Sequence, residues 1–189
     1  MAKFRVSALR LMRVPLAVFA LCASFDPATA IQPTLEKITS EADGTATYHF
    51  KIKIDETVHV EGQAKDPDPD FFTIFNFVGM VPGSERQPPG WTFSTSTNGV
   101  TPYRGGRTVL SPIDIEGIPN LTWSHTGAPL RGPAEVSGFS VRTTVKETMV
   151  GEYGSQVTRN SPGTLTPGAP ADLKEARIGS ITTPKVPAK

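Results

Sequence analysis

Proline and glycine recur so often along this chain that no set of long helices fits it. The 189 residues include 18 Pro and 17 Gly, scattered from end to end. Proline removes a backbone donor and clashes inside a helix, and glycine carries a large entropic cost there. Turn-forming pairs such as Asp43-Gly44, Pro82-Gly83, Pro89-Gly90 and Asn98-Gly99 separate the apolar runs. This punctuation predicts an all-β fold.

The clearest strand is "TATYHFKIKI", residues 45–54, in which apolar side chains alternate with polar ones. Other strand-like runs are 57–63, 71–78, 91–97, 108–115, 120–126, 135–146, 152–159 and, more weakly, 176–183. Residues 31–41 could add an N-terminal edge strand. Seven to nine short strands at this spacing are typical of an antiparallel β-sandwich, immunoglobulin-like or jelly-roll-like.

The first thirty residues have the pattern of a secretory signal peptide. Lys3, Arg5, Arg10 and Arg13 form a basic region, residues 15–25 are apolar, and Ala28-Thr29-Ala30 is a small-x-small cleavage pattern. The apolar run is about half the roughly twenty residues that a membrane-spanning helix needs. We therefore expect cleavage before Ile31, no transmembrane segment after it, and a secreted, periplasmic or extracellular protein.

Removal of residues 1–30 changes the charge and the cysteine content. That segment carries four of the 19 Lys and Arg, one of the 18 Asp and Glu, and the single cysteine, Cys22, so the remaining chain has a net charge of −2. Without disulfides, stability must come from a hydrophobic core, for which one domain of this size is long enough. The balanced charge gives no electrostatic footprint for nucleic acid.

Residues 70–100 contain two aromatic-rich runs on either side of a Pro/Gly-rich bend. In residues 71–78 both alternating faces carry apolar side chains, which predicts a central strand. Phe77 is expected in the space between the sheets, where a large apolar side chain contributes roughly 1.5–3 kcal/mol. Trp91 begins the next strand in phase with Phe93. We interpret these aromatic residues mainly as core.

Three segments carry a resemblance to known proteins: "DFFTIFNFVGMVPGSERQPPGWTFSTSTNGVTP", "IPNLTWSHTGAPLRGPAEVSGFSVRTTV" and "GSITTPKVP". Together they resemble a group of uncharacterised exported bacterial proteins whose members often end in a PEP-CTERM sorting tail. The resemblance covers most of residues 45–184 and implies one β-rich domain, with no catalytic residues. This chain departs from the group at Val186-Pro187-Ala188-Lys189, which lacks the Pro-Glu-Pro signal, apolar helix and basic terminus of such a tail.

The common catalytic patterns are missing from the sequence. There is no Gly-x-Ser-x-Gly elbow and no phosphate-binding glycine loop. His49, His59 and His125 lack the close spacing of a zinc site. Asp114 lies in the expected strand 108–115 and Glu116 directly follows it. The two alternate on one face, where they are either acids that meet one ligand or the solvated side of a strand with Ile113 and Ile115 inward.

The segment "DPDPD" is the most suggestive polar cluster. Asp66, Asp68 and Asp70 alternate with two prolines, so three carboxylates could face one side and offer oxygen ligands to calcium. The segment fails as an EF-hand, because Phe71 and Phe77 stand where that loop needs Gly and Glu. The other interpretation is a stiff, solvated linker that leads into the strand at Phe71. No other cofactor is indicated.

The C-terminal part of the chain predicts a long loop and a closing strand. Residues 160–180 mix turn formers with one helix-capable stretch, residues 171–177. The expected domain organisation is a signal peptide at 1–30, a single β-sandwich at 31–183 and a disordered tail at 184–189.

Two classes of function remain open. The first is an exported, non-enzymatic β-sandwich with a structural or binding role in the envelope or extracellular matrix, with polysaccharides or envelope proteins as partners. Its more specific form is a carbohydrate-binding module in which at least two of Trp91, Tyr103 and Trp123 are exposed and roughly coplanar stacking faces. The second is a secreted hydrolase or lyase that acts on a polysaccharide with acids such as Asp114 and Glu116.

Overall fold

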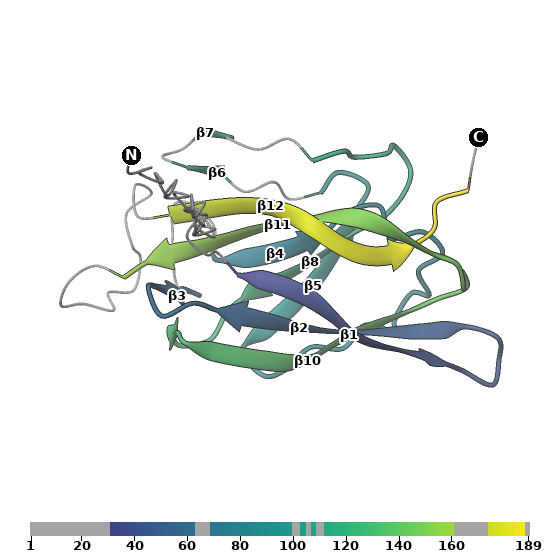
Figure 1. Cartoon of the computed structure of the whole chain (residues 1–189), viewed down its shortest axis with the longest axis horizontal. Coiled ribbons are helices and arrows are strands. Elements are labelled where there is room, and N and C mark those ends of the chain that lie inside the picture. Colours follow the sequence, from purple (N-terminus) through teal and green to yellow (C-terminus); the bar gives the residue numbers. More distant parts are fainter. Residues whose placement is uncertain are drawn as a thin grey trace, which may run out of the picture.

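The computed structural model describes residues 31–62, 69–99, 103–104, 107–108, 112–160 and 174–187. This part of the chain is all-β, without a helix, and two antiparallel sheets pack together as a sandwich of about ten strands (Figure 1). Among these residues, none belongs to a helix of the length and apolarity needed to cross a membrane. The predicted signal peptide, residues 1–30, lies outside the described residues.

Sheet A has three strands in the order β1-β2-β10. They are β1 (Gln32–Ser40), β2 (Ala46–Ile54) and β10 (Ala134–Thr143). Apolar and polar residues alternate along β2 as expected, with Tyr48, Phe50 and Ile52 fully buried. The register of β10 against β2 shifts at Gly138, where φ is +100°. Glycine adopts this value without strain, and the bulge places Phe139 and Val141 in the core.

Sheet B has seven strands in the order β5-β8-β4-β11-β3-β9, with β12 paired to β11. They are β3 (Val58–Val60), β4 (Phe71–Ile74), β5 (Trp91–Ser96), β8 (Asn120–His125), β9 (Leu130–Arg131), β11 (Thr148–Arg159) and β12 (Lys174–Pro184). A two-stranded hairpin, β6 (Tyr103–Arg104) and β7 (Arg107–Thr108), lies near β12 (Figure 1). The strand expected at 152–159 is β11, which begins four residues earlier, at Thr148.

Aromatic side chains from both sheets fill the space between them. The ring of Tyr48 in sheet A meets the edge of Phe77 at a centroid distance of 5.4 Å. Trp123 in sheet B stacks on Phe72 at 5.1 Å and lies 6.2 Å from Phe50 in sheet A. The interpretation of these aromatic residues as core is confirmed.

Strand β4 is central, as expected, but it ends sooner than the sequence suggests. It lies between β8 and β11, and all four of its side chains are buried. Asn76 then takes a left-handed conformation, with φ of +55°. This breaks the alternation, so Phe77 joins Phe72 and Ile74 in the inter-sheet core instead of facing away from them.

One expected strand is wrong in the part that the structure describes, and the possible N-terminal edge strand is present. Of the run 108–115, Thr108 belongs to β7, residues 109–111 lie outside the described residues, and residues 112–115 are irregular, because hydrogen bonds to Asn76 and Glu152 hold their backbone instead of a strand partner. The closing strand expected at 176–183 is confirmed as β12, which starts earlier, at Lys174. Residues 32–40 form the edge strand β1.

Candidate functional site

Two of the three proposed stacking residues lie in the hydrophobic core. Trp91 is 5% exposed and Trp123 is 0% exposed. Trp91 packs between Phe72, His125 and Phe139, so neither of its faces is open to a sugar. Tyr103 lies in β6, and its side chain is outside the described part of the structure. The prediction of a carbohydrate platform from these rings is therefore corrected at Trp91 and Trp123, which packing between the sheets has buried.

Of the three aspartates in the "DPDPD" segment, the structure describes only Asp70. Asp66 and Asp68 lie outside the described residues. Asp70 is 0% exposed, and its oxygen atoms are engaged by protein groups. The two interpretations of the segment are corrected at Asp70 alone: this residue is buried and not part of a solvated linker, and its carboxylate is paired with Lys174 instead of being turned outwards as a calcium ligand.

Asp70 belongs to a buried group of polar side chains that we call the Asp70 cluster: His59, Glu61, Asp70, Thr158 and Lys174. All five are buried, and they come from β3 and the residue after it, the entry to β4, β11 and the start of β12. Asp70 and Glu61 are tied by their backbones, since Asp70 N donates to Glu61 O at 2.8 Å. Strand pairing places His59 directly across from Thr158, and Thr158 across from Lys174.

The two oxygen atoms of the Asp70 carboxylate have different partners. Oδ1 accepts a hydrogen bond from Lys174 Nζ at 2.7 Å. Oδ2 accepts from the backbone N of Glu61 at 2.7 Å and from the hydroxyl of Thr158 at 2.8 Å. Lys174 Nζ also donates to Thr158 Oγ1 at 2.9 Å, so that hydroxyl bridges the ammonium and the carboxylate.

His59 is a neutral base beside this ion pair. Asn160 donates its amide N–H to Glu56 O at 2.8 Å, which turns its Oδ1 towards His59 Nδ1 at 3.0 Å. Nδ1 must then carry the proton, and Nε2 presents a lone pair that has no hydrogen-bond partner in the described part of the chain. Burial lowers the pKa of His59, the Asn160 hydrogen bond and Glu61 oppose this, and Lys174 adds to it.

Burial also changes the acidity of Asp70. It raises the pKa of this carboxyl from 3.8 to about 6, against the opposing effects of Lys174 and of the hydrogen bonds from Glu61 and Thr158. Desolvation outweighs the attraction of the ammonium because a carboxylate loses all its water on full burial. The protonated form of Asp70 is thus far easier to reach than that of an exposed aspartate.

Sequence reasoning missed Lys174, the most unusual residue of this cluster. A fully buried lysine is rare unless it is paired. Its partner Asp70 is 104 positions away in the chain. No local pattern links the two, and the alternation of β12 is too weakly apolar to mark Lys174 as an inward residue.

The acids proposed for a hydrolase do not face a common site. Asp114 accepts hydrogen bonds from Asn120 Nδ2 at 2.9 Å and from Gly99 N at 3.0 Å, so it holds two loops together. Glu116 is exposed on a turn. Nor do the described residues contain a group of three or more His, Cys, Asp or Glu side chains that could hold a metal ion.

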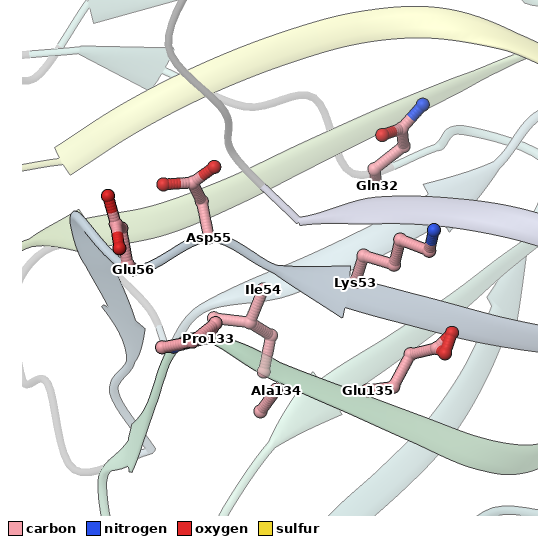
Figure 2. A pocket seen from close by; sticks show the side chains of 8 residues that line it. All are labelled: Gln32, Lys53, Ile54, Asp55, Glu56, Pro133, Ala134 and Glu135. Carbon is pink, nitrogen blue, oxygen red and sulfur yellow. The ribbon is translucent and has the colours of Figure 1, made fainter.

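A surface pocket of about 600 Å³ lies at one end of sheet A (Figure 2). Strand pairing aligns Gln32, Lys53 and Glu135 in a row across β1, β2 and β10. Asp55 and Glu56 lie at the other end of the pocket, after β2 (Figure 2). Such a mixture of one ammonium, three carboxylates and an amide suits a polar ligand.

The residue next to Pro133, which lines this pocket, must be a glycine. The peptide bond between Gly132 and Pro133 is cis, and a Cβ atom at Gly132 would lie 1.8 Å from the carbonyl oxygen of Asp55. No side chain fits in that space, so Gly132 allows β10 to start directly against the end of β2.

Comparison with protein-family models, with curated proteins and with solved structures gives no match. The resemblance to exported proteins with a PEP-CTERM tail therefore stays a prediction.

Proposed function

We propose that this chain is an exported β-sandwich with a structural, non-enzymatic role in the cell envelope or extracellular matrix. The observation that carries the proposal is the Asp70 cluster. Its charged and hydroxyl side chains bind one another and fix the closing strand β12 to the interior of the sheet. The signal-peptide pattern of residues 1–30 supports export. Ile31, the first residue after the expected cleavage site, packs in the core.

The experiment follows the full chain in a bacterial host with a secretion pathway. We expect N-terminal sequencing of the exported protein to begin at Ile31, and the protein to fractionate with the envelope or matrix. Recovery of the uncleaved chain inside the cell would contradict export.

The same preparation tests the enzymatic alternative, a secreted hydrolase or lyase. The purified protein is incubated with a panel of bacterial and plant polysaccharides, and new reducing ends and unsaturated products are measured. We expect neither. Turnover that survives Asp114→Asn but not Glu135→Gln would instead locate a catalytic site at the pocket in sheet A.

A second candidate function is binding of a polar ligand, such as a polysaccharide, at the pocket in Figure 2. The row of Gln32, Lys53 and Glu135 across three strands favours it, because hydrogen-bonding groups on rigid strands are well placed to orient hydroxyl groups. Thermal-shift titration with the same polysaccharides tests it. A shift that Glu135→Ala removes and Glu147→Ala leaves intact would support this site.

A further inference from the structure

Lys174 and Asp70 form an ion pair with no exposure to solvent. Both side chains are 0% exposed, and Nζ lies 2.7 Å from Oδ1. Removal of water from two charges is unfavourable, and their mutual attraction often fails to offset this. A covalent amide between them would abolish both charges and keep the two side chains next to each other.

The environment of the pair resembles that of a reacting acyl group. Two donors, Glu61 N–H and the Thr158 hydroxyl, both point at Oδ2. Donors arranged in this way stabilise negative charge that develops on an oxygen during attack at its carbon. The amine approaches from the side of the other oxygen, Oδ1, and Thr158 Oγ1 holds it there by a second hydrogen bond.

The protonation states of the surrounding groups also favour such a reaction. Amide formation needs an uncharged amine and an uncharged acid, and the raised pKa of Asp70 brings its protonated form within reach. The charged or titratable groups around the pair are His59 on β3, Glu61 directly after β3, and Arg131 on β9, which acts on His59. Of these, His59 has a buried lone pair at Nε2 and can carry a proton.

We infer that Lys174 and Asp70 join in an intramolecular isopeptide bond. A proton first passes from the Lys174 ammonium to Oδ1 of Asp70, which gives a neutral amine and a neutral acid. Nζ then attacks Cγ, and the oxyanion forms on Oδ2. Oδ1 departs as water with a second proton from Nζ, so the Nζ–Cγ bond replaces the Cγ–Oδ1 bond. An ammonium and a carboxylate become one amide and one water, and no other reactant is consumed.

The decisive measurement is the mass of the full chain after purification and complete denaturation. A cross-linked chain is lighter than its sequence by one water molecule. Trypsin does not cut after Lys174 once its amine is acylated, and a branched peptide joining the segments of residues 70 and 174 appears in its place. A wild-type protein with the full sequence mass and ordinary cleavage after Lys174 overturns the inference and leaves a buried ion pair only.

Two variants give the measurement its controls. Lys174→Arg keeps a cation but cannot form this amide, and we expect it to have the full mass; near-ultraviolet circular dichroism shows whether it folds. Lys185 pairs with Glu147 at 2.6 Å on the surface, with side chains 55% and 72% exposed. Lys185→Arg should leave the missing water and the branched peptide unchanged. A mass deficit that persists in Lys174→Arg would assign it to another reaction and overturn the inference.

A third variant tests the role assigned to Thr158. Thr158→Val removes one donor to Oδ2 and one acceptor from Nζ, while the shape of the side chain is kept. Removal of one such donor commonly slows an acyl reaction by about 10²–10³-fold. We expect freshly made Thr158→Val to contain a large uncross-linked fraction that matures slowly. Cross-linking as complete and as fast as in the wild type would exclude Thr158 from the reaction.

The inference is independent of the proposed function. A missing cross-link would leave a structural role intact, and a cross-linked chain could still prove to be an enzyme. The mass measurement and the polysaccharide assays therefore fail separately.

Discussion

The aromatic core between the sheets and the Asp70 cluster are both buried from solvent, yet they are stabilised in different ways. In the aromatic core, contacts such as Trp123 on Phe72 are non-directional, and their free energy follows the area removed from water. In the Asp70 cluster, one carboxylate depends on three specific donors: the backbone N of Glu61 just after β3, Thr158 in β11 and Lys174 in β12. In the aromatic core, the stability lost when a side chain is removed grows with the size of that side chain. In the Asp70 cluster, removal of any one donor leaves a buried polar atom unpaired and is costly whatever its size.

The largest effect is expected from a cavity in the aromatic core. Trp123→Ala removes a ring that contacts Phe50, Phe72 and Phe93, and should lower the free energy of unfolding by about 3–5 kcal/mol. Urea denaturation measures it. Trp91→Phe, which keeps most of the volume, is the control and should cost clearly less; equal losses would mean that packing volume does not set the stability of this core.

Loss of the Thr158 hydroxyl distinguishes the Asp70 cluster from the aromatic core, because it removes hydrogen bonds but almost no volume. As long as Asp70 and Lys174 are an ion pair, Thr158→Val leaves each without one hydrogen bond, and should cost about 1–3 kcal/mol although almost no volume is lost. The matched control is Thr122→Val, which breaks the neutral Thr73 to Thr122 pair of 2.8 Å and should cost about 0.5–1.5 kcal/mol. If both changes cost the same in urea denaturation, the charges of the cluster add nothing.

Acid pH tests an exposed carboxylate against the buried one. Hydrogen bonds from Thr45 and Arg142 lower the pKa of Asp43 from 3.8 to about 2. Its contribution to stability is present above pH 3.8 and is lost as the pH falls through about 2. Asp43→Asn should flatten this acid limb when unfolding free energy is followed against pH. An unchanged limb would assign it to other carboxyl groups.

The buried carboxylate predicts the opposite slope if it stays free. With a pKa raised to about 6, Asp70 binds its proton more tightly in the folded chain, so its contribution falls as the pH rises from 3.8 through about 6. Once Asp70 is an amide, this slope disappears. The same pH titration thus sharpens the contrast between a titrating and a cross-linked cluster.

The smallest effect is expected at the surface. Lys185→Met breaks the exposed pair with Glu147 and should change the free energy of unfolding by less than about 1 kcal/mol, since water screens both charges. Thermal denaturation measures it. A larger loss would show that this contact anchors the end of β12.

The sequence was sufficient where structure follows a local pattern. The alternation around Phe50 predicts both β2 and its buried face, and the apolar character of both faces predicts a central β4. Asn76 was not readable in this way, because only the structure reveals that its left-handed conformation turns Phe77 back into the core. The burial of Trp91 was the favoured interpretation and follows from its phase with Phe93.

The Asp70 cluster could not be predicted for a physical reason. Its members come from four segments, and the register of β12 on β11, which no sequence pattern fixes, decides whether Lys174 meets Asp70 or water. The proline-rich setting of Asp70 and the polar neighbours of Lys174 both suggest exposure. The same holds for the pocket in Figure 2, whose row of polar side chains depends on the pairing of β1, β2 and β10.

The position of Lys174 at the first residue of β12 has a mechanical consequence. A chain pulled at its C-terminal end would peel this strand from β11, starting at the pair of Thr148 with Pro184 and moving towards the pair of Thr158 with Lys174. The backbone hydrogen bonds would break one after another until the force reached Lys174, whose buried side chain is held by Asp70. The slack released before that stop is only the length of residues 175–184, so β12 would act as a short extensible tether fastened at its root.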